Sequence, residues 1–276
     1  MRNASAFAKI NLALVVGPRR ADGKHEVATV LQEVDLIDSI TLEPGPDLRV
    51  TGFADDTLVE RALRDLAAAA RVEPRWHVAI DKQIPVAAGL AGGSSNAAAA
   101  LRLANETLPE PLPPRQLSGL AASLGADIPF FLASGPKLGT SDGTVLEPLD
   151  LPLDYAVLLL LPDGAVKSST ADVYREFDRR GGDAGFEERR HGLLEALRSV
   201  RTPRDLAALP SNDLASSPLA AEIQGRGAFR ADVSGAGPAL YGLFDDERGA
   251  GAAAAELSGL GATWVCAPHR GTVEPR

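Results

Sequence analysis

The sequence predicts an α+β fold divided into two lobes. Its 276 residues suffice for two modest domains. Segments with helical spacing and apolar segments typical of strands follow one another irregularly, which favours α+β over the strict βαβα order of a doubly wound sheet. Hydrophobic residues make up 45% and charged residues 24%, so the chain can bury a core, and disordered and fibrous classes are excluded. We expect domains over 1–150 and 151–276, because segment 151–154 leads into a new apolar strand.

The first of these domains is expected to mix strands and helices. Alternating, β-branched residues predict a strand over 6–16, and Asp22-Gly23 in the following loop is typical of a hairpin turn. Apolar residues at helical spacing predict a helix over 57–71. The further elements expected are a strand over 76–80, a helix that follows a glycine-rich loop and reaches Asn105, and a helix over 116–124.

The second domain is expected to begin with a buried strand. Residues 155–161 are uninterruptedly apolar and are followed by Pro162, and this run is far shorter than the roughly 20 residues that span a bilayer. A strand over 232–244 carries a second glycine-rich turn. Helices are expected over 171–180, 186–200, 214–224 and 249–258.

Charge and cysteine content exclude several classes of protein. A net charge of −9 argues against a nucleic-acid partner. The single cysteine, Cys266, excludes an internal disulfide framework and a cysteine-rich metal site. Lys9 and Asn11 interrupt the apolar N-terminal stretch, which is therefore expected to be neither a signal peptide nor a membrane anchor. The sequence thus predicts a soluble, cytoplasmic protein, and we expect it to be a monomer or a weak homodimer.

The strongest chemical signal is the segment IPVAAGLAGGSSNAAAALRLAN at 84–105. Gly89, Gly92 and Gly93 permit close backbone approach, and Ser94, Ser95 and Asn96 are good N-cap residues before a strong helix former. A loop of this kind presents free N–H groups and the positive end of a helix dipole, which predicts a phosphate cradle. No lysine precedes the two serines, so it is not a P-loop, and the glycine spacing does not fit a dinucleotide fingerprint. The alternative is a loop that is rich in glycine for tight packing only.

Three segments together resemble the GHMP small-molecule kinases. AGLAGGSSNAAAA is similar to their nucleotide-binding loop, FAKINLALVV to their N-terminal segment, and SGAGPALYGLF at 234–244 to their third, glycine-rich motif. Within this family, further blocks resemble the branch of the 4-diphosphocytidyl-2-C-methyl-D-erythritol kinases from about Ala6 to Leu243. These blocks are AKINL, DGKHE, GLAGGSSNAAAAL, LGADIPFFL, SSTADVYREFD and SNDLASSPLA, in this order.

The resemblance implies a fold, a reaction and a cofactor. The fold would be the two-lobed GHMP kinase fold, with an N-terminal lobe like domain 2 of ribosomal protein S5 and a ferredoxin-like C-terminal lobe. The reaction would be ATP-dependent phosphorylation of the 2-hydroxyl of a cytidine diphosphate-linked methylerythritol, a step in the non-mevalonate route to isoprenoids. Mg²⁺ is expected because ATP is used as its Mg²⁺ complex.

The resemblance also assigns residues to the nucleotide and to the reacting hydroxyl. Asp127 would accept the hydroxyl proton, while Lys9 would hold that carboxylate ionised and offset charge on the transferred phosphoryl group. The alternative for this pair is a buried salt bridge that joins two motifs. Ser95 and Asp127 are the candidate ligands of the metal. The ATP-binding residues implied are Pro85, Val86, Ala87, Ala88, Gly89, Leu90, Ala91, Gly92, Gly93, Ser94, Ser95 and Asn96.

The acceptor site is implied in the same way. His25 would hydrogen-bond the cytosine, and Tyr174 would stack on it. The alternative for Tyr174 is an ordinary position in an apolar helix stripe with Val173 and Phe177. The weaker acceptor contacts implied are Asn11, Lys24, Thr170, Gly235 and Gly237.

Two residues depart from the family's pattern. Lys24 stands where the family has a tyrosine that completes an aromatic sandwich around cytosine, and base stacking is worth roughly 1–3 kcal/mol. Asn96 stands where the family has an aspartate, which removes a negative charge near the phosphates. The first departure bears on substrate choice, and the second bears on metal handling and rate.

These departures define the alternatives to a kinase that acts on the cytidine diphosphate-linked methylerythritol. Lys24 is compatible with a GHMP kinase that acts on a different alcohol, and Asn96 with a non-catalytic nucleotide-binding paralogue. An RNA-binding module like ribosomal protein S5 is disfavoured by the net negative charge.

Overall fold

The chain folds into two compact units, neither of which is a continuous half of the sequence. A computed structural model describes residues 1–53, 57–165 and 169–271. The first unit comprises Met1–Ala8, Leu36–Val86 and Ala91–Ser134, and the second comprises Lys9–Asp35, Ala87–Leu90 and Gly135–Arg276. This division follows contacts in space, and the expected lobes over 1–150 and 151–276 stay a prediction.

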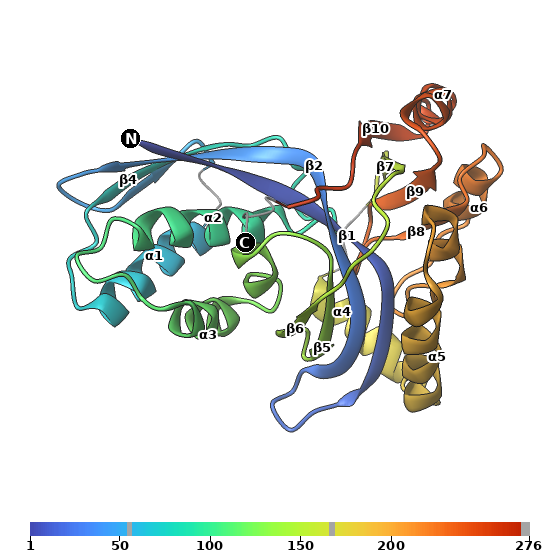
Figure 1. Ribbon diagram of the computed structural model, residues 1–276, viewed down its shortest axis with the longest axis horizontal. Helices are drawn as coiled ribbons and strands as arrows, with labels where there is room; N and C mark the ends of the chain where they lie inside the picture. Colours follow the sequence, from blue (N-terminus) through green and yellow to red (C-terminus); the bar gives the residue numbers. More distant parts are fainter. Residues whose placement is uncertain (54–56, 166–168, 272–276) are drawn as a thin grey trace. The chain divides into compact units, whose positions relative to one another are not determined.

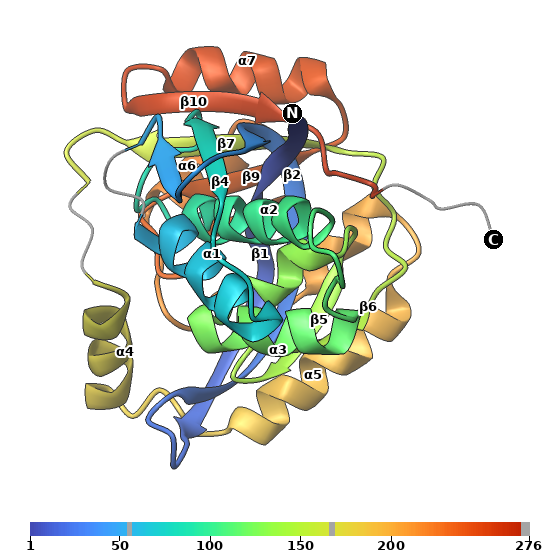
Figure 2. The ribbon, with the colours of Figure 1, turned by 90° about the vertical axis from the view of Figure 1, so that its left-hand side faces the viewer.

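The first unit places helices beside a small piece of sheet. Strand β4 (Trp76–Asp81) pairs antiparallel with the end of β2 (His25–Pro44) and parallel with β3 (Arg49–Thr51). Helices α1 (Thr57–Ala70) and α2 (Gly92–Asn105) lie side by side (Figure 2). The alanines of α2 are almost completely buried, and their small side chains allow the two helices to approach closely. The unit is completed by α3 (Pro114–Leu124) and a 3₁₀ turn, η1 (Pro129–Leu132).

The second unit contains an antiparallel sheet with the strand order β10-β7-β9-β8. These strands cover Gly261–Cys266, Ala156–Pro162, Leu240–Phe244 and Arg230–Val233. Alternate residues of β7, including Leu158 and Leu160, pack in one core cluster with residues of α6 (Leu219–Gln224) and α7 (Glu247–Leu257) (Figure 1). This strand is apolar throughout because the residues between them, such as Val157 and Leu159, are buried as well.

The long strand β1 (Arg2–Arg19) pairs with β2, and both strands contribute residues to each unit. In the second unit, β2 continues the sheet into β5 (Lys137–Ser141) and β6 (Val145–Pro148). Helix α4 (Thr170–Arg179) inserts Phe177 into a cluster with Leu14 and Val27 of the two long strands. Helix α5 (Phe186–Ser199) and the 3₁₀ turn η2 (Pro203–Ala208) follow.

Most elements expected from the sequence are confirmed, and two are corrected. The helix expected over 214–224 covers only 219–224, because Pro218 has no backbone N–H for a helix interior and the N–H of Leu214 is taken by the Asn212 side chain. The strand expected over 232–244 is two strands, β8 and β9, separated by the glycine-rich turn. None of the described helices has the length and apolarity needed to span a membrane.

We expect Leu158→Ala to lower the free energy of unfolding by about 2–5 kcal/mol, because it leaves a cavity beneath the helices of the second unit. Denaturant unfolding measures this. Val145 is 58% exposed, so Val145→Ala should cost less than about 1 kcal/mol. Equal losses in the two variants would contradict this assignment of the core.

Candidate active site

The segment 87–90 of the glycine-rich loop docks against two other parts of the second unit. Its backbone carbonyls accept hydrogen bonds from the N-terminal strand and from the turn between β8 and β9. These are Lys9 N to Leu90 O at 3.1 Å, Ala239 N to Ala88 O at 2.9 Å, and Ser234 Oγ to Gly89 O at 3.1 Å. Three segments that resemble one family in the sequence therefore meet at one place.

Gly89 shows how close this contact is. Its φ is +89°, and a Cβ atom added there would lie 2.3 Å from the carbonyl oxygen of Ser234 and 3.0 Å from that of Gly237. Only glycine permits both the left-handed backbone and the absence of a side chain. In the facing turn, Gly235 and Gly237 also have positive φ, at +57° and +72°.

Helix α2 begins at the end of the same loop, in the first unit. Its N-cap is Ala91, which adopts a left-handed conformation and makes no side-chain cap. The expectation that Ser94, Ser95 and Asn96 cap the helix was wrong, because the left-handed turn at Ala91 starts the helix earlier and places them inside its first two turns. A Cβ atom at Gly93 would meet no atom within 4 Å, so this face of the first turn is open for a ligand to approach the backbone.

Ser95 and Asn96 face the protein interior and are 2% and 0% exposed. At position 96 a neutral amide is easier to bury than the carboxylate that stands there in the family. The remaining residues assigned to ATP differ in exposure: Pro85 and Gly89 are half-buried, Ala88, Leu90 and Gly92 are buried, and Val86 and Ala87 are exposed.

An ammonium group lies beside the start of α2, although no lysine stands directly before the two serines in the sequence. Lys82 Nζ bonds to Asp38 Oδ2 at 2.7 Å and would lie 3.0 Å from a Cβ atom at Gly92. Asp38 is completely buried, and its other carboxylate oxygen accepts the N–H groups of Gln83 and Ile84. This pair fixes the entry to the loop. The DKQIP run carries the lysine next to the loop, but nothing in the sequence indicates its partner 44 residues earlier.

Lys9 and Asn11 lie on one face of β1, two residues apart, and both are almost fully buried. Lys9 Nζ donates to Asn11 Oδ1 at 2.6 Å, and Asn11 Nδ2 donates to Thr29 Oγ1 at 2.8 Å. A Cβ atom at Gly235 would lie 3.4 Å from Lys9 Nζ and 3.3 Å from Asn11 Oδ1. The ammonium group is therefore held in a fixed position against the same turn that receives Gly89.

Asp127 belongs to the first unit. It is half-buried in a turn between α3 and η1, where Ile128 N donates to Gly125 O. Its pairing with Lys9 stays a prediction.

His25 and Tyr174, which are 149 positions apart in the sequence, are in contact in the second unit. Their rings stack with centroids 4.7 Å apart, and His25 Nε2 lies 2.7 Å from Asp178 Oδ1. Tyr174 also packs with Val173 against the cluster of Phe177, so its place in an apolar helix stripe is confirmed as well. Asp178 was missed in the sequence, although it lies four residues after Tyr174 and hence on the same face of α4.

Lys24 lies beside Asp142 in the turn between β5 and β6. Their side chains form an ion pair at 2.5 Å, and Asp142 is only 11% exposed. Burial alone would raise the pKa of Asp142, but hydrogen bonds from Lys24 and Thr144 lower it to about 2. Thr170 is exposed at the first position of α4.

No group of three histidine, cysteine or acidic side chains is arranged to hold a metal in the part of the chain that the structure describes. A Mg²⁺ ion that arrives with ATP needs only one or two protein ligands because phosphates and water supply the others. Ser95 and Asp127 stay predictions for that role.

We expect Gly89→Ala to lower the free energy of unfolding by about 1–3 kcal/mol and to weaken nucleotide binding, because the new methyl group meets a backbone carbonyl in a disfavoured conformation. Gly93→Ala, in open space on a helix, should cost no stability. Thermal unfolding and binding calorimetry with ADP measure both effects. A Gly89→Ala variant as stable as the wild type would contradict the tight docking.

Unfolding at acid pH should reveal how much the ion pair of Lys24 and Asp142 contributes to stability. With its pKa at about 2, below the ordinary value of 3.8, Asp142 contributes stability that is complete above about pH 4 and is lost as the pH falls towards 2. Lys24→Met removes the hydrogen bond that lowers this pKa, so the variant should lose less stability between pH 4 and pH 2. Urea unfolding at several pH values measures this, with Asp142→Asn as the matched variant. An unchanged pH dependence in both would contradict the pair.

Comparison with known proteins agrees with these features. The model of the GHMP kinases N-terminal domain matches residues 57–135. The 4-diphosphocytidyl-2-C-methyl-D-erythritol kinase of Salinispora arenicola (strain CNS-205) is 39% identical over 96% of this chain and 90% of that protein. That of Gloeobacter violaceus (strain ATCC 29082 / PCC 7421) is 39% identical over 92% of this chain and 89% of that protein.

Solved structures agree as well. A crystal structure of 4-(cytidine 5'-diphospho)-2C-methyl-D-erythritol kinase matches with a TM-score of 0.80 and 30% identity, and the match covers 98% of this chain and all of the other. A mevalonate kinase matches with a TM-score of 0.77 at 14% identity over 98% of this chain and all of the other, a likeness of fold alone. The expected α+β GHMP kinase fold is thereby confirmed, and the chain belongs to the GHMP kinases, in the family of the 4-diphosphocytidyl-2-C-methyl-D-erythritol kinases.

Proposed function

We propose that this kinase transfers the γ-phosphoryl group of ATP to the 2-hydroxyl of 4-diphosphocytidyl-2-C-methyl-D-erythritol. The observation that carries the proposal is that Gly89 docks on the turn between β8 and β9, next to which the side chains of Lys9 and Asn11 also lie. It brings a glycine-rich loop and a fixed ammonium group to one turn. The relatives at 39% identity, which carry this acceptor in their name, support the choice of substrate.

The phosphates of ATP are bound mainly by backbone N–H groups in this proposal. Residues 85–96 supply a loop rich in glycine and alanine and the N-terminus of α2, whose first N–H groups have no partner within the helix. Lys82 adds a positive charge beside Gly92. Ser95 and Asp127 are the candidate protein ligands of a Mg²⁺ ion that would arrive with ATP, and the ion would neutralise charge on the phosphates.

At the reacting hydroxyl, Asp127 accepts the proton as the acceptor oxygen attacks. Lys9 stabilises negative charge on the transferred group, and its hydrogen bond to Asn11 keeps the ammonium from swinging away. Phosphoryl transfer depends mainly on alignment and charge neutralisation, so these residues need not be strongly basic. Burial of Lys9 strengthens its electrostatic effect by excluding water.

On the acceptor side, His25 and Tyr174 form a wall that suits a pyrimidine base. Asp178 holds the imidazole by Nε2 and so fixes the orientation of its ring. Lys24, at the tip of the hairpin, offers a cation to the diphosphate or to the base. Asn11, Thr170, Gly235 and Gly237 complete the proposed acceptor contacts.

A GHMP kinase reaction on a different alcohol is the second candidate. The ion pair of Lys24 with Asp142 favours it, because it places a charged pair where the family has an aromatic side chain. A non-catalytic nucleotide-binding paralogue is the third, with Asn96 as its basis.

The deciding experiment is a coupled assay of ADP release with Mg-ATP and 4-diphosphocytidyl-2-C-methyl-D-erythritol. We expect turnover by the wild type, and a fall in kcat of at least about 100-fold in Lys9→Met and in Asp127→Asn. Asp65→Asn, an exposed position on α1, is the matched control and should retain full activity.

The alternatives give different results in this assay. A wild type that binds ATP but leaves this acceptor untouched contradicts the substrate, and activity on another alcohol would then support the second candidate. Full activity in Asp127→Asn contradicts its role as the proton acceptor.

A further inference from the structure

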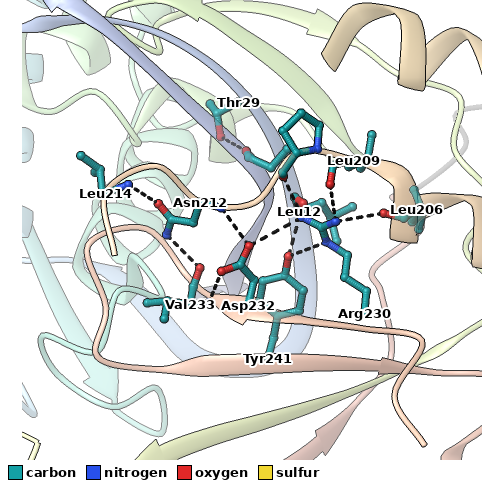
Figure 3. A network of polar contacts seen from close by, with 12 residues as sticks. Leu12, Thr29, Leu206, Leu209, Asn212, Leu214, Arg230, Asp232, Val233 and Tyr241 are labelled. Carbon is teal, nitrogen blue, oxygen red and sulfur yellow. Dashed lines mark hydrogen bonds and ion pairs between the residues drawn. The ribbon is translucent and has the colours of Figure 1, made fainter. Parts of the chain in front are cut away.

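A buried polar network, whose side chains are drawn in Figure 3, adjoins the turn between β8 and β9 that receives Gly89. At its centre is Asn212, which is 8% exposed and lies between η2 and α6. Its Nδ2 donates to the carbonyl oxygens of Val233 at 2.9 Å and Gly235 at 2.6 Å, and its Oδ1 accepts the N–H of Leu214 at 2.8 Å. One amide group therefore ties the first part of the turn to a separate segment of chain.

Asn212 is itself held in place from the side of β8. Its backbone N–H donates to Asp232 Oδ2 at 2.8 Å, and Asp232 Oδ1 accepts the N–H of Val233 at 2.8 Å. Arg230 lies 3.7 Å from this carboxylate and bonds to the Tyr241 hydroxyl, which donates to Leu12 O. Of these groups, Asp232 alone bonds to Asn212, and it fixes the Asn212 backbone.

The segment that contains Asn212 also pairs with β1, the strand that carries Lys9. Asn212 forms a parallel bridge with Leu14, and Asp213 N donates to Leu14 O at 2.9 Å. Asp213 Oδ2 accepts the N–H of Val16 at 2.8 Å. Asn212 thus connects β1 with the turn between β8 and β9.

Gly235, which Asn212 anchors, lies next to Lys9, Asn11 and Gly89. A Cβ atom at Gly235 would lie 3.3 Å from Asn11 Oδ1, 3.4 Å from Lys9 Nζ and 3.5 Å from Gly89 O. A shift of Gly235 by even one ångström would change its distance from Asn11, Lys9 and Gly89. Interiors are close-packed and transmit such shifts.

We propose that Asn212 is a positioning residue of the kinase: by holding the carbonyl of Gly235, it sets the turn against which both the nucleotide loop and Lys9 are aligned. Asn212 is bonded to protein groups on every polar atom of its side chain, so it acts through Gly235 and touches neither nucleotide nor acceptor. The inference rests on the proposed function, because it assigns a role in that reaction.

The test compares Asn212→Ser and Asn212→Asp with Tyr241→Phe. Both changes at position 212 remove the amide donor to Gly235, whereas Tyr241→Phe removes hydrogen bonds from the same buried network and leaves that donor in place. We expect a fall in kcat of at least tenfold and a severalfold rise in the Kd for ADP in the Asn212 variants. Tyr241→Phe should keep both values within twofold of the wild type, although its thermal stability falls.

A merely structural role would give a different signature. Partial unfolding lowers the number of binding sites per chain, while the Kd of the folded molecules stays the same, and calorimetry with ADP reports both. Asn212→Ser introduces no charge, so it keeps the test decisive if the aspartate variant does not fold. A folded Asn212→Ser protein with kcat and Kd within twofold of the wild type would overturn the proposal.

Failure of the proposed function is recognisable separately. If the wild type binds ADP but does not phosphorylate the acceptor, the substrate assignment fails. The Kd for ADP of the Asn212 variants then still tests whether Asn212 positions the nucleotide loop. A wild type that binds no ADP overturns both.

Discussion

The contact between Gly89 and the turn formed by residues 234–237 is the constraint on which the proposed active site depends. The two backbones approach so closely that a single methyl group at Gly89 would overlap a carbonyl oxygen. This contact needs positive φ at Gly89, Gly235 and Gly237. It therefore explains why two segments that are 145 residues apart are both rich in glycine. Phosphate recognition by backbone requires a loop without side chains, and such a loop is rigid only where another backbone supports it.

Buried polar side chains supply the rigidity that the glycines lack. Lys9, Asn11 and Thr29 form one chain of hydrogen bonds beneath the turn, and Asp38 with Lys82 forms another at the entry to the loop. Removal of one partner from a buried ion pair typically costs about 3–5 kcal/mol, because the remaining charge is left without compensation. These groups therefore keep their positions under conditions in which an exposed ion pair would exchange with water.

The proposed acceptor side is built differently, from side chains brought together by strands and a helix. His25 begins β2, Tyr174 and Asp178 lie one turn apart on α4, and Lys24 meets Asp142 at the end of the neighbouring hairpin. These contacts are between rings and charges of side chains, whereas the glycine-rich loop is held by backbone contacts.

The sequence by itself determined the fold class and most of the elements, because helical periodicity and apolar runs are local properties that tertiary contacts override at few places here. The role of the glycine-rich loop in nucleotide binding stays a prediction. Tertiary structure alone decided the partners: Asp178 for His25, Asp142 for Lys24, Asp38 for Lys82 and Asn212 for Gly235. It also moved the start of α2 to Gly92 and divided the expected strand over 232–244 in two. A carboxylate or an amide is compatible with many positions in a sequence, and only folding selects the one donor or acceptor that it meets.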